Sequence, residues 1–278
     1  MAQSGRPAHH PPGRMIRDFG RAAGGALIFS LPMLMTMELW SLGFYLDRLR
    51  LLLLVVVTLP LLVLLSRHIG FERTRGWRSD VVDSLIALGV AAIISVMVLL
   101  LLGVIDATTS LDAVLGKISI QMVPASIGAL LAKSQLGAGS GDDPEEQDES
   151  WWGELFLMAV GALFLGLNTA PTEEVMVISY QMTHWHALAL VVLSLLLMHG
   201  FVFSVGFAGG SEVSSEEPWW SAFIRMTLPG FIIALTVSFC LLWLFARTDG
   251  LSFDSALMAT IVLAFPCAIG AAAARLIL

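Results

Sequence analysis

Charged residues are scarce in this sequence. Only 13% of its 278 residues are Asp, Glu, Lys or Arg, whereas 57% are hydrophobic and the mean hydropathy is +0.83. Because a soluble domain carries roughly a quarter charged residues, this composition excludes a soluble globular enzyme and a disordered chain. The Lys and Arg residues form no basic stripe, so we expect no nucleic-acid partner.

Cysteine and tyrosine are also rare, with two of each. Cys240 and Cys267 both lie within apolar stretches, so we expect neither a disulfide framework nor a thiolate metal site, and no cofactor is predicted. A transmembrane β-barrel would show alternating segments of about ten residues, and this chain has continuous apolar runs instead. A polytopic helical membrane protein remains.

Long apolar runs are what the sequence has in abundance. A helix needs about 20 apolar residues to cross the hydrocarbon core of a bilayer. We therefore expect an all-α fold, a membrane bundle of about eight transmembrane helices in contact with lipid. These helices are expected at residues 24–45, 50–66, 81–105, 114–133, 152–180, 186–207, 219–246 and 255–277.

Polar segments flank and divide the apolar runs. Residues 1–22 are expected to form a disordered tail, and residues 136–151 an acidic linker between two repeats at 23–135 and 152–278. Arginine clusters precede the first run and follow the second, and the positive-inside rule places both clusters in the cytoplasm. With eight spans, both termini and the linker are expected to be cytoplasmic.

The two repeats are recognised by matching motifs. Gly25-Ala26-Leu27 recurs 136 residues later, as does the Thr36-x-Glu38 pattern. The pattern Pro-x-x-Ile-Gly-Ala occurs at Pro124 and again at Pro266, 142 residues later. Because each repeat has an even number of helices, the two four-helix repeats are expected to be parallel. Small residues permit close helix contacts, so we expect Gly128 and Gly270 at such contacts.

Carboxylates stand inside two of the apolar runs. A charged side chain at the bilayer centre costs about 3 kcal/mol or more, so Glu38 and Glu174 are expected to face one polar cavity shared by both repeats. Pro171 should free a backbone carbonyl beside them. The candidate ion- or proton-binding residues are Glu38, Glu173, Glu174, Thr36, Thr172 and Asn168. Their oxygens suit a proton or a hard cation, and structural hydrogen bonding near the outer interface is the alternative.

Two further polar residues within the spans are candidate proton relays. His199 could relay protons, or it could be held by structural hydrogen bonds. Gln121 has the apolar counterpart Leu263 in the second repeat, so any pathway through it would be asymmetric. No sequence motif identifies a metal.

The motifs around these residues resemble a known family. They are Pro32-x-x-x-Thr36-x-Glu38-x-Trp40, the segment from Ala170 to Glu174, and the two Pro-x-x-Ile-Gly-Ala segments. The pattern resembles a family of bacterial integral membrane proteins of unknown function, and the resemblance covers nearly the whole chain beyond the tail. It implies a multi-pass protein of the bacterial inner membrane and no particular activity.

Three functions stay open at this point. The first is an ion or proton-coupled transporter or channel that uses Glu38, Glu173 and Glu174 to bind a small cation or proton. The second is a non-transporting assembly factor, sensor or partner subunit, and a homo-oligomer is compatible with either. The third is an intramembrane hydrolase, because Glu173-Glu174 followed by His199 looks like the pattern of prenyl-protein-processing metalloproteases. That family needs Arg five residues after the first Glu, where Ile178 stands, so we expect no enzyme.

Overall fold

The computed structural model describes residues 12–69, 77–137, 151–204 and 219–277. These residues are helical apart from short connections, and none of them forms a strand. Seven helices are long and apolar enough to cross a membrane, and an eighth span is formed if the bent pair α1 and α2 is taken as one. The prediction of a polytopic helical membrane protein is confirmed.

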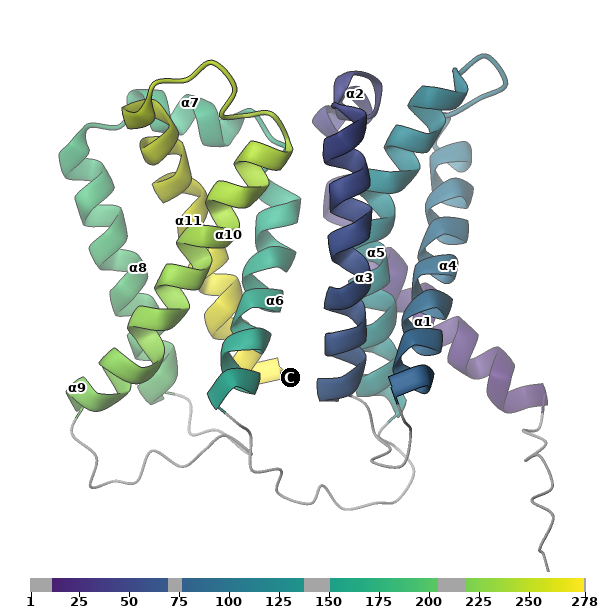
Figure 1. The fold of residues 1–278 in the computed structure, drawn as a ribbon, viewed down its shortest axis with the longest axis horizontal. Helices are drawn as coiled ribbons and strands as arrows, with labels where there is room; N and C mark the ends of the chain where they lie inside the picture. The colour runs from purple at the N-terminus through teal and green to yellow at the C-terminus, as the bar shows by residue number, and fades with distance from the viewer. Residues whose placement is uncertain (1–11, 70–76, 138–150, 205–218, 278) are drawn as a thin grey trace, which may run out of the picture.

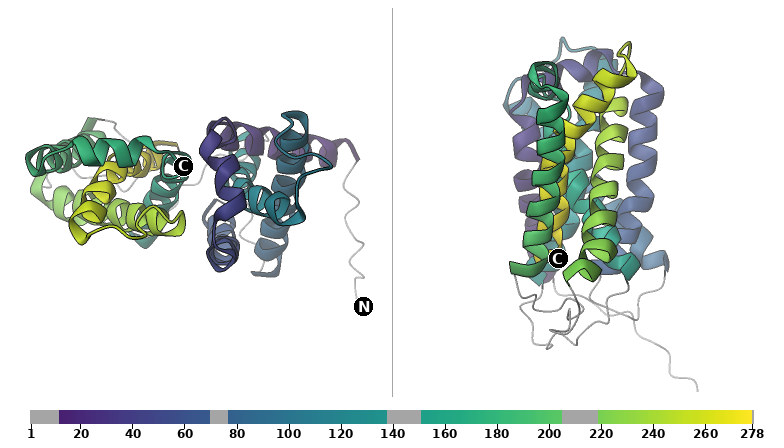
Figure 2. Two further views of the ribbon diagram at one scale, coloured as in Figure 1. Left: turned by 90° about the horizontal axis from the view of Figure 1, so that it is seen from above. Right: turned by 90° about the vertical axis from the view of Figure 1, so that its left-hand side faces the viewer.

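The helices form two groups along the chain. The first half contains α1 (Pro12–Leu34), α2 (Met37–Tyr45), α3 (Arg48–Ile69), α4 (Trp77–Leu101) and α5 (Leu111–Gly137). The second half contains α6 (Trp151–Thr169), α7 (Glu174–Gln181), α8 (His184–Ser204), α9 (Trp219–Ala222), the π-helix η1 (Phe223–Thr227), α10 (Leu228–Leu244) and α11 (Phe253–Ile277). Seen from above, the halves are two bundles side by side (Figure 2).

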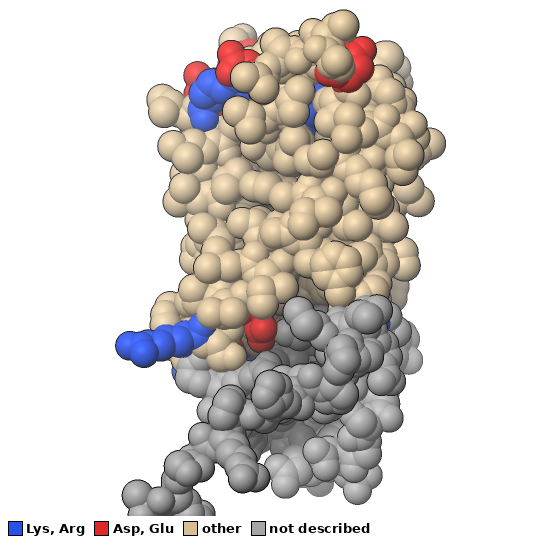
Figure 3. Space-filling model, turned by 90° about the vertical axis from the view of Figure 1, so that its right-hand side faces the viewer, with Lys and Arg blue, Asp and Glu red and all other residues tan. Residues whose placement is uncertain are grey.

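Most of the long helices run roughly along one axis while α1 crosses them obliquely, and α2 and α7 lie at the same end of their two bundles (Figure 1). We call this the outer end, following the expected topology, and the opposite end the inner end. α1 begins and α11 finishes at the inner end. Charged side chains gather at the two ends of the visible face and leave an uncharged band between them (Figure 3). That distribution suits a protein whose middle lies in hydrocarbon.

Close helix crossings organise each half. α5 packs against the other helices of the first half, and α11 does so in the second. A Cβ added to Gly25 of α1 would lie less than 3.0 Å from the carbonyl oxygen of Gly128 in α5. Gly161 of α6 and Gly270 of α11 approach each other in the same way. The expectation that Gly128 and Gly270 lie at close contacts is confirmed, because only small residues allow such approach.

Two of the expected continuous helices are broken, which corrects the sequence prediction. The expected helix 24–45 ends at Leu34, and α2 continues from Met37 at an angle of 86°. The expected helix 152–180 ends at Thr169, and α7 starts at Glu174. Hydropathy could not reveal these breaks, since the segments on both sides of each break are apolar.

The boundaries of the flanking segments also differ from the prediction. α1 begins at Pro12, so residues 12–22 are helical and the expected tail is shorter than residues 1–22. No proline interrupts the chain between Pro12 and Pro32, and a helix is free to continue beyond the apolar span. Most of the expected linker at 136–151 lies outside the described residues.

Candidate functional site at the outer end

The outer end holds both helix breaks. At the first break, the hydroxyl of Thr36 donates to the carbonyl oxygen of Met33 at 2.8 Å. The indole N–H of Trp40 donates to the carbonyl oxygen of Leu34 at 3.0 Å. The last carbonyls of a helix have no partner within the helix and need one from elsewhere. Two nearby side chains therefore satisfy the end of α1 and allow the chain to turn sharply into α2.

The second break, between α6 and α7, is closed differently. The hydroxyl of Thr172 donates to the carbonyl oxygen of Thr169 at 2.8 Å, as Thr36 does at the first break. Arg247, from the loop between α10 and α11, donates to the carbonyl oxygen of Pro171. A guanidinium thus satisfies the backbone carbonyl of the proline itself, and the protein supplies a positive charge at this break.

Asn168 stands one turn before the second break. Its amide nitrogen donates to the carbonyl oxygen of Phe164 at 2.8 Å. Its side-chain oxygen is buried and has no hydrogen-bond partner among the described residues. A buried polar atom without a partner is uncommon in proteins, so this oxygen is a candidate ligand-contacting atom.

The predicted acids do not share a buried cavity. Glu38 lies in the first turn of α2 and is half-buried, whereas Glu173 and Glu174 are exposed at the start of α7. The expectation that Glu174 faces the bundle interior is wrong. Because the helix breaks before it, Glu174 lies at the outer end of the second half and not along a spanning helix. No hydrogen bond or ion pair in the described part of the chain joins Glu38 to Glu173 or Glu174.

Lys117 is a buried cation of the first half. It lies in α5, its side chain is only 4% exposed, and its ammonium donates to the carbonyl oxygen of Val104 at 2.7 Å. The same ammonium lies 4.6 Å from the ring centre of Phe44 in α2. Its place inside the span, as the seventh residue of α5, was the signal in the sequence. An ionisable residue buried in a span is a functional candidate by default.

Arg50 connects the two halves at the outer end. It lies in the first turn of α3 and donates to a carboxylate oxygen of Asp249, in the α10–α11 loop, at 2.9 Å. Its guanidinium also lies 5.1 Å from the ring centre of Trp243 in α10. A planar guanidinium suits both contacts, because it can stack on an aromatic ring while it donates in its own plane.

The two relay candidates lie in different halves. Gln121 of α5 is fully buried, and its amide nitrogen donates to the carbonyl oxygen of Ser30 at 3.1 Å. Its side-chain oxygen has no partner in the described residues. His199 of α8 is hydrogen-bonded to Thr227 of the π-helix η1 at 3.0 Å. No described contact connects the two, so the proton relay stays a prediction.

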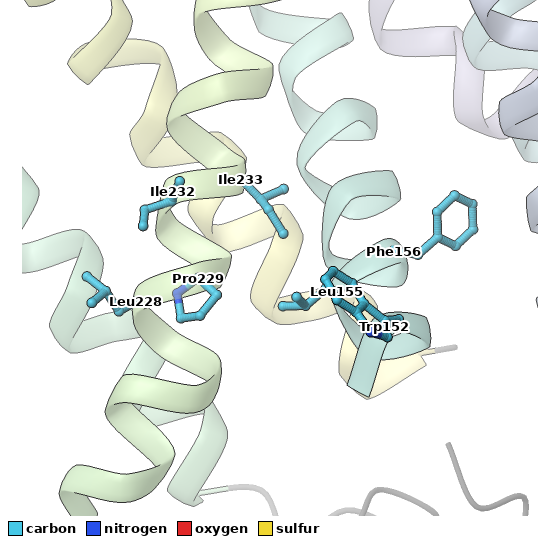
Figure 4. Close-up of a pocket in the computed structure, with 7 residues that line it drawn as sticks. All are labelled: Trp152, Leu155, Phe156, Leu228, Pro229, Ile232 and Ile233. Atoms are coloured by element: carbon cyan, nitrogen blue, oxygen red, sulfur yellow. The ribbon is translucent and has the colours of Figure 1, made fainter. Parts of the chain in front are cut away.

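Two grooves in the described part of the chain are not lined by the predicted acids. One, of about 480 Å³, lies between α6 and α10 and has an apolar lining of Trp152, Leu155, Phe156, Leu228, Pro229, Ile232 and Ile233 (Figure 4). The other, of about 320 Å³, lies between α3 and α5 beside Arg48 and Asp112. Within the described residues, no three His, Cys, Asp or Glu side chains are placed to hold a metal ion.

Comparison with known proteins identifies a family. Residues 18–278 match the model of a family described as "Putative integral membrane protein (DUF2391)". No curated protein and no solved structure matches the chain.

Proposed function

Since the chain belongs to this family of integral membrane proteins, we propose that it is an ion or proton-coupled transporter or channel. Its solute enters at the outer end, where α1–α2 and α6–α7 are broken. The observation that carries the proposal is that both halves break a helix at matching positions. Broken helices in corresponding positions of two halves are a feature of transporter binding sites.

We also propose that the halves are parallel repeats of one ancestral unit. At both breaks a threonine hydroxyl caps the carbonyl three residues earlier, in Thr36 and in Thr172. Matching polar side-chain contacts join the helices that follow. Arg48 pairs with Asp112 at 4.0 Å, and His184 pairs with Asp254 at 2.9 Å, each from the start of one long helix to the start of another. The glycine crossings of α1 with α5 and of α6 with α11 match as well.

The side chains at the breaks have different proposed roles. Thr36 and Thr172 already donate to backbone carbonyls, which fits a role in holding the breaks open. Glu38 is the best placed acid, because it is half-buried in the first turn after a break. Glu173 and Glu174 are exposed and would act as charges at the entrance that concentrate cations or protons.

The proposed location is a bacterial inner membrane with both termini in the cytoplasm. Support comes from Arg67 and Arg78, which are exposed at the inner end. Cytoplasmic loops carry an excess of Lys and Arg. A reporter active only in the cytoplasm, fused after residue 278, should be active. A fusion at 107 in the α4–α5 loop should be inactive, and reversed activities would contradict this topology.

Transport is tested with purified protein in liposomes. A pH-sensitive dye inside the vesicles reports proton movement while Na⁺, K⁺, Ca²⁺ and anion gradients are applied in turn. We expect flux in the wild type, strong loss in Glu38→Gln, and a smaller loss in Glu173→Gln, since that exposed acid is proposed to act only as a charge at the entrance. The absence of any flux, or equal flux in both variants, would contradict the proposed role of Glu38.

A second candidate is the non-transporting membrane protein. It is favoured by the exposure of Glu173 and Glu174 and by the apolar lining of the α6–α10 groove. On this view the breaks and ion pairs only shape a surface for a partner subunit. If no tested solute is transported and the Glu38→Gln variant has normal thermal stability, this alternative is favoured.

A further inference from the structure

Unsatisfied hydrogen-bonding atoms gather where the halves meet at the outer end. Arg50 uses one amino group to contact Asp249, but its other amino nitrogen is buried without a partner in the described residues. A guanidinium donates through five N–H groups, and leaving a buried donor unpaired costs about 1–3 kcal/mol. A ligand with a hydrogen-bond acceptor could satisfy this buried N–H donor.

The loop that carries Asp249 supplies a second donor. Arg247, two residues earlier, contacts the carbonyl oxygen of Pro171 with an amino group, while its Nε is buried and unpaired. Asn168, three residues before Pro171, presents the buried side-chain oxygen without a partner. The Arg50–Asp249 and Arg247–Pro171 contacts, together with the short stretches of chain between these residues, therefore bring two unpaired donors and one unpaired acceptor to the same region of the outer end. We call Arg50, Arg247 and Asn168 the outer cluster.

The charge and chemistry of the outer cluster select the ligand. Arg50 pairs with the acid Asp249, whereas Arg247 contacts only a backbone carbonyl, so the two arginines and this acid together carry one net positive charge. Guanidinium groups bind phosphate oxygens strongly, often with two parallel hydrogen bonds. Asn168 still needs a donor, which a hydroxyl can supply. Two guanidinium groups would repel a metal cation.

The position of the outer cluster also favours an anion of the membrane surface. Trp243, on which Arg50 stacks, lies at the end of α10, where aromatic residues mark the headgroup layer. We propose that the outer cluster binds the phosphate of an anionic ligand that also carries a hydroxyl group. Arg50 and Arg247 donate to the phosphate oxygens, and Asn168 accepts from the hydroxyl. The source is either an anionic lipid headgroup or a free phosphate ester.

Binding is measured on the full chain in phosphatidylcholine nanodiscs. Titrations with short-chain phosphatidylglycerol and with glycerol phosphate follow the tryptophan fluorescence and the midpoint of thermal unfolding. We expect saturable binding that raises the unfolding midpoint. Losing one charge-assisted hydrogen bond, worth about 1.5–3 kcal/mol, should weaken binding about tenfold or more in Arg50→Gln and in Arg247→Gln.

Arg48→Gln is the matched control. Arg48 lies in the same turn of α3, but its side chain is 47% exposed, whereas that of Arg50 is 18% exposed. Arg48 lies 4.0 Å from Asp112, whereas Arg50 lies 2.9 Å from Asp249. We expect wild-type binding in this control. If Arg50→Gln fails to fold, Arg247→Gln and Asn168→Ala provide the test, because neither removes the contact between the halves.

The outcomes separate the two sources and the two proposals. Binding of phosphatidylglycerol alone identifies a lipid site, and binding of glycerol phosphate as well identifies a site for soluble phosphate esters; both support the inference. Failure of both ligands to bind, or equal binding by Arg247→Gln and wild type, overturns it. The inference does not rest on transport, since binding without flux would remove only the proposed transport function.

Discussion

The closest crossing of α1 and α5 allows a sharp test, because two neighbouring glycines face different surroundings. A Cβ added to Gly25 would lie less than 3.0 Å from the carbonyl oxygen of Gly128 and from the Cβ of Ala132. A Cβ added to Gly24 would meet nothing within 4 Å. The carbonyl oxygen of Gly128 belongs to the backbone of α5, so it cannot move aside as a flexible side chain would.

The magnitude follows from comparing the two substitutions. Replacing Gly by Ala inside a helix gains about 1 kcal/mol of helix propensity at either position. This gain cancels in the difference between Gly24→Ala and Gly25→Ala, which leaves the cost of separating α1 from α5. Overpacking of this kind costs about 1–3 kcal/mol. We therefore expect Gly24→Ala to be neutral or stabilising and Gly25→Ala to be the less stable of the two.

The measurement is thermal or denaturant unfolding of both variants in the same detergent, followed by tryptophan fluorescence. The second half offers an independent repetition, with Gly161→Ala at the crossing of α6 with α11 and Gly200→Ala in the open as its control. Equal stability of Gly24→Ala and Gly25→Ala would refute the close approach of α1 and α5. A difference in the first half alone would show that the second crossing is looser than described.

Three further predictions concern the outer loops. Asp106 accepts hydrogen bonds from Thr108 and Thr109, and these side-chain contacts lower its pKa from 3.8 to about 2; because the folded-state pKa is depressed, its stabilising effect is present above about pH 4 and is lost as the pH falls towards 2. NMR titration should show this pKa, and Thr108→Val should raise it; an unchanged pKa in the variant would contradict the assigned cause. Lys117→Met should accelerate hydrogen exchange around Val104 while global stability stays the same or rises, because a buried ammonium is removed together with its hydrogen bond; strong global destabilisation would show that the ammonium is needed for folding. Ala246 has φ 60°, a left-handed conformation that favours glycine, so Ala246→Gly should raise the free energy of unfolding by about 1 kcal/mol; a lower free energy of unfolding in chemical denaturation would contradict the strain.

Hydropathy predicted the spanning helices well because each run had to be apolar wherever it meets lipid. The glycine crossings were also predictable, since Gly128 and Gly270 recur within the same motif. These features depend on local composition and repetition, and both can be read along a single chain.

The helix breaks were not predictable in the same way. The break after Leu34 is stabilised by the indole of Trp40 and the hydroxyl of Thr36, and neither contact is visible in an apolar run. At the second break Pro171 indicated a kink, but Arg247, which satisfies the carbonyl of Pro171, lies far along the chain. The orientation of Glu174 depended on that break, and the prediction about its burial was wrong for this reason.

The outer cluster depends on contacts between the halves. Arg50 and Asp249 are 199 positions apart in the chain, and the sequence contains no motif that pairs them. Lys117 was visible in the sequence as a cation within an apolar run, yet only the packing of α2 against α5 shows that it is buried.

The crossing of the first long helix of each half with its last has a consequence for biosynthesis. α1 packs most extensively on α5, and α6 on α11. The first helix of each half therefore cannot complete its packing until the last helix of that half has left the ribosome. Until then the glycine faces of α1 and α6 are covered only by lipid or by the insertion machinery. Because most contacts stay within one half, we expect the first bundle to close while the second is still being synthesised. A nascent chain that stops before residue 111 should therefore remain bound to insertion factors, and one that includes α5 should be released from them.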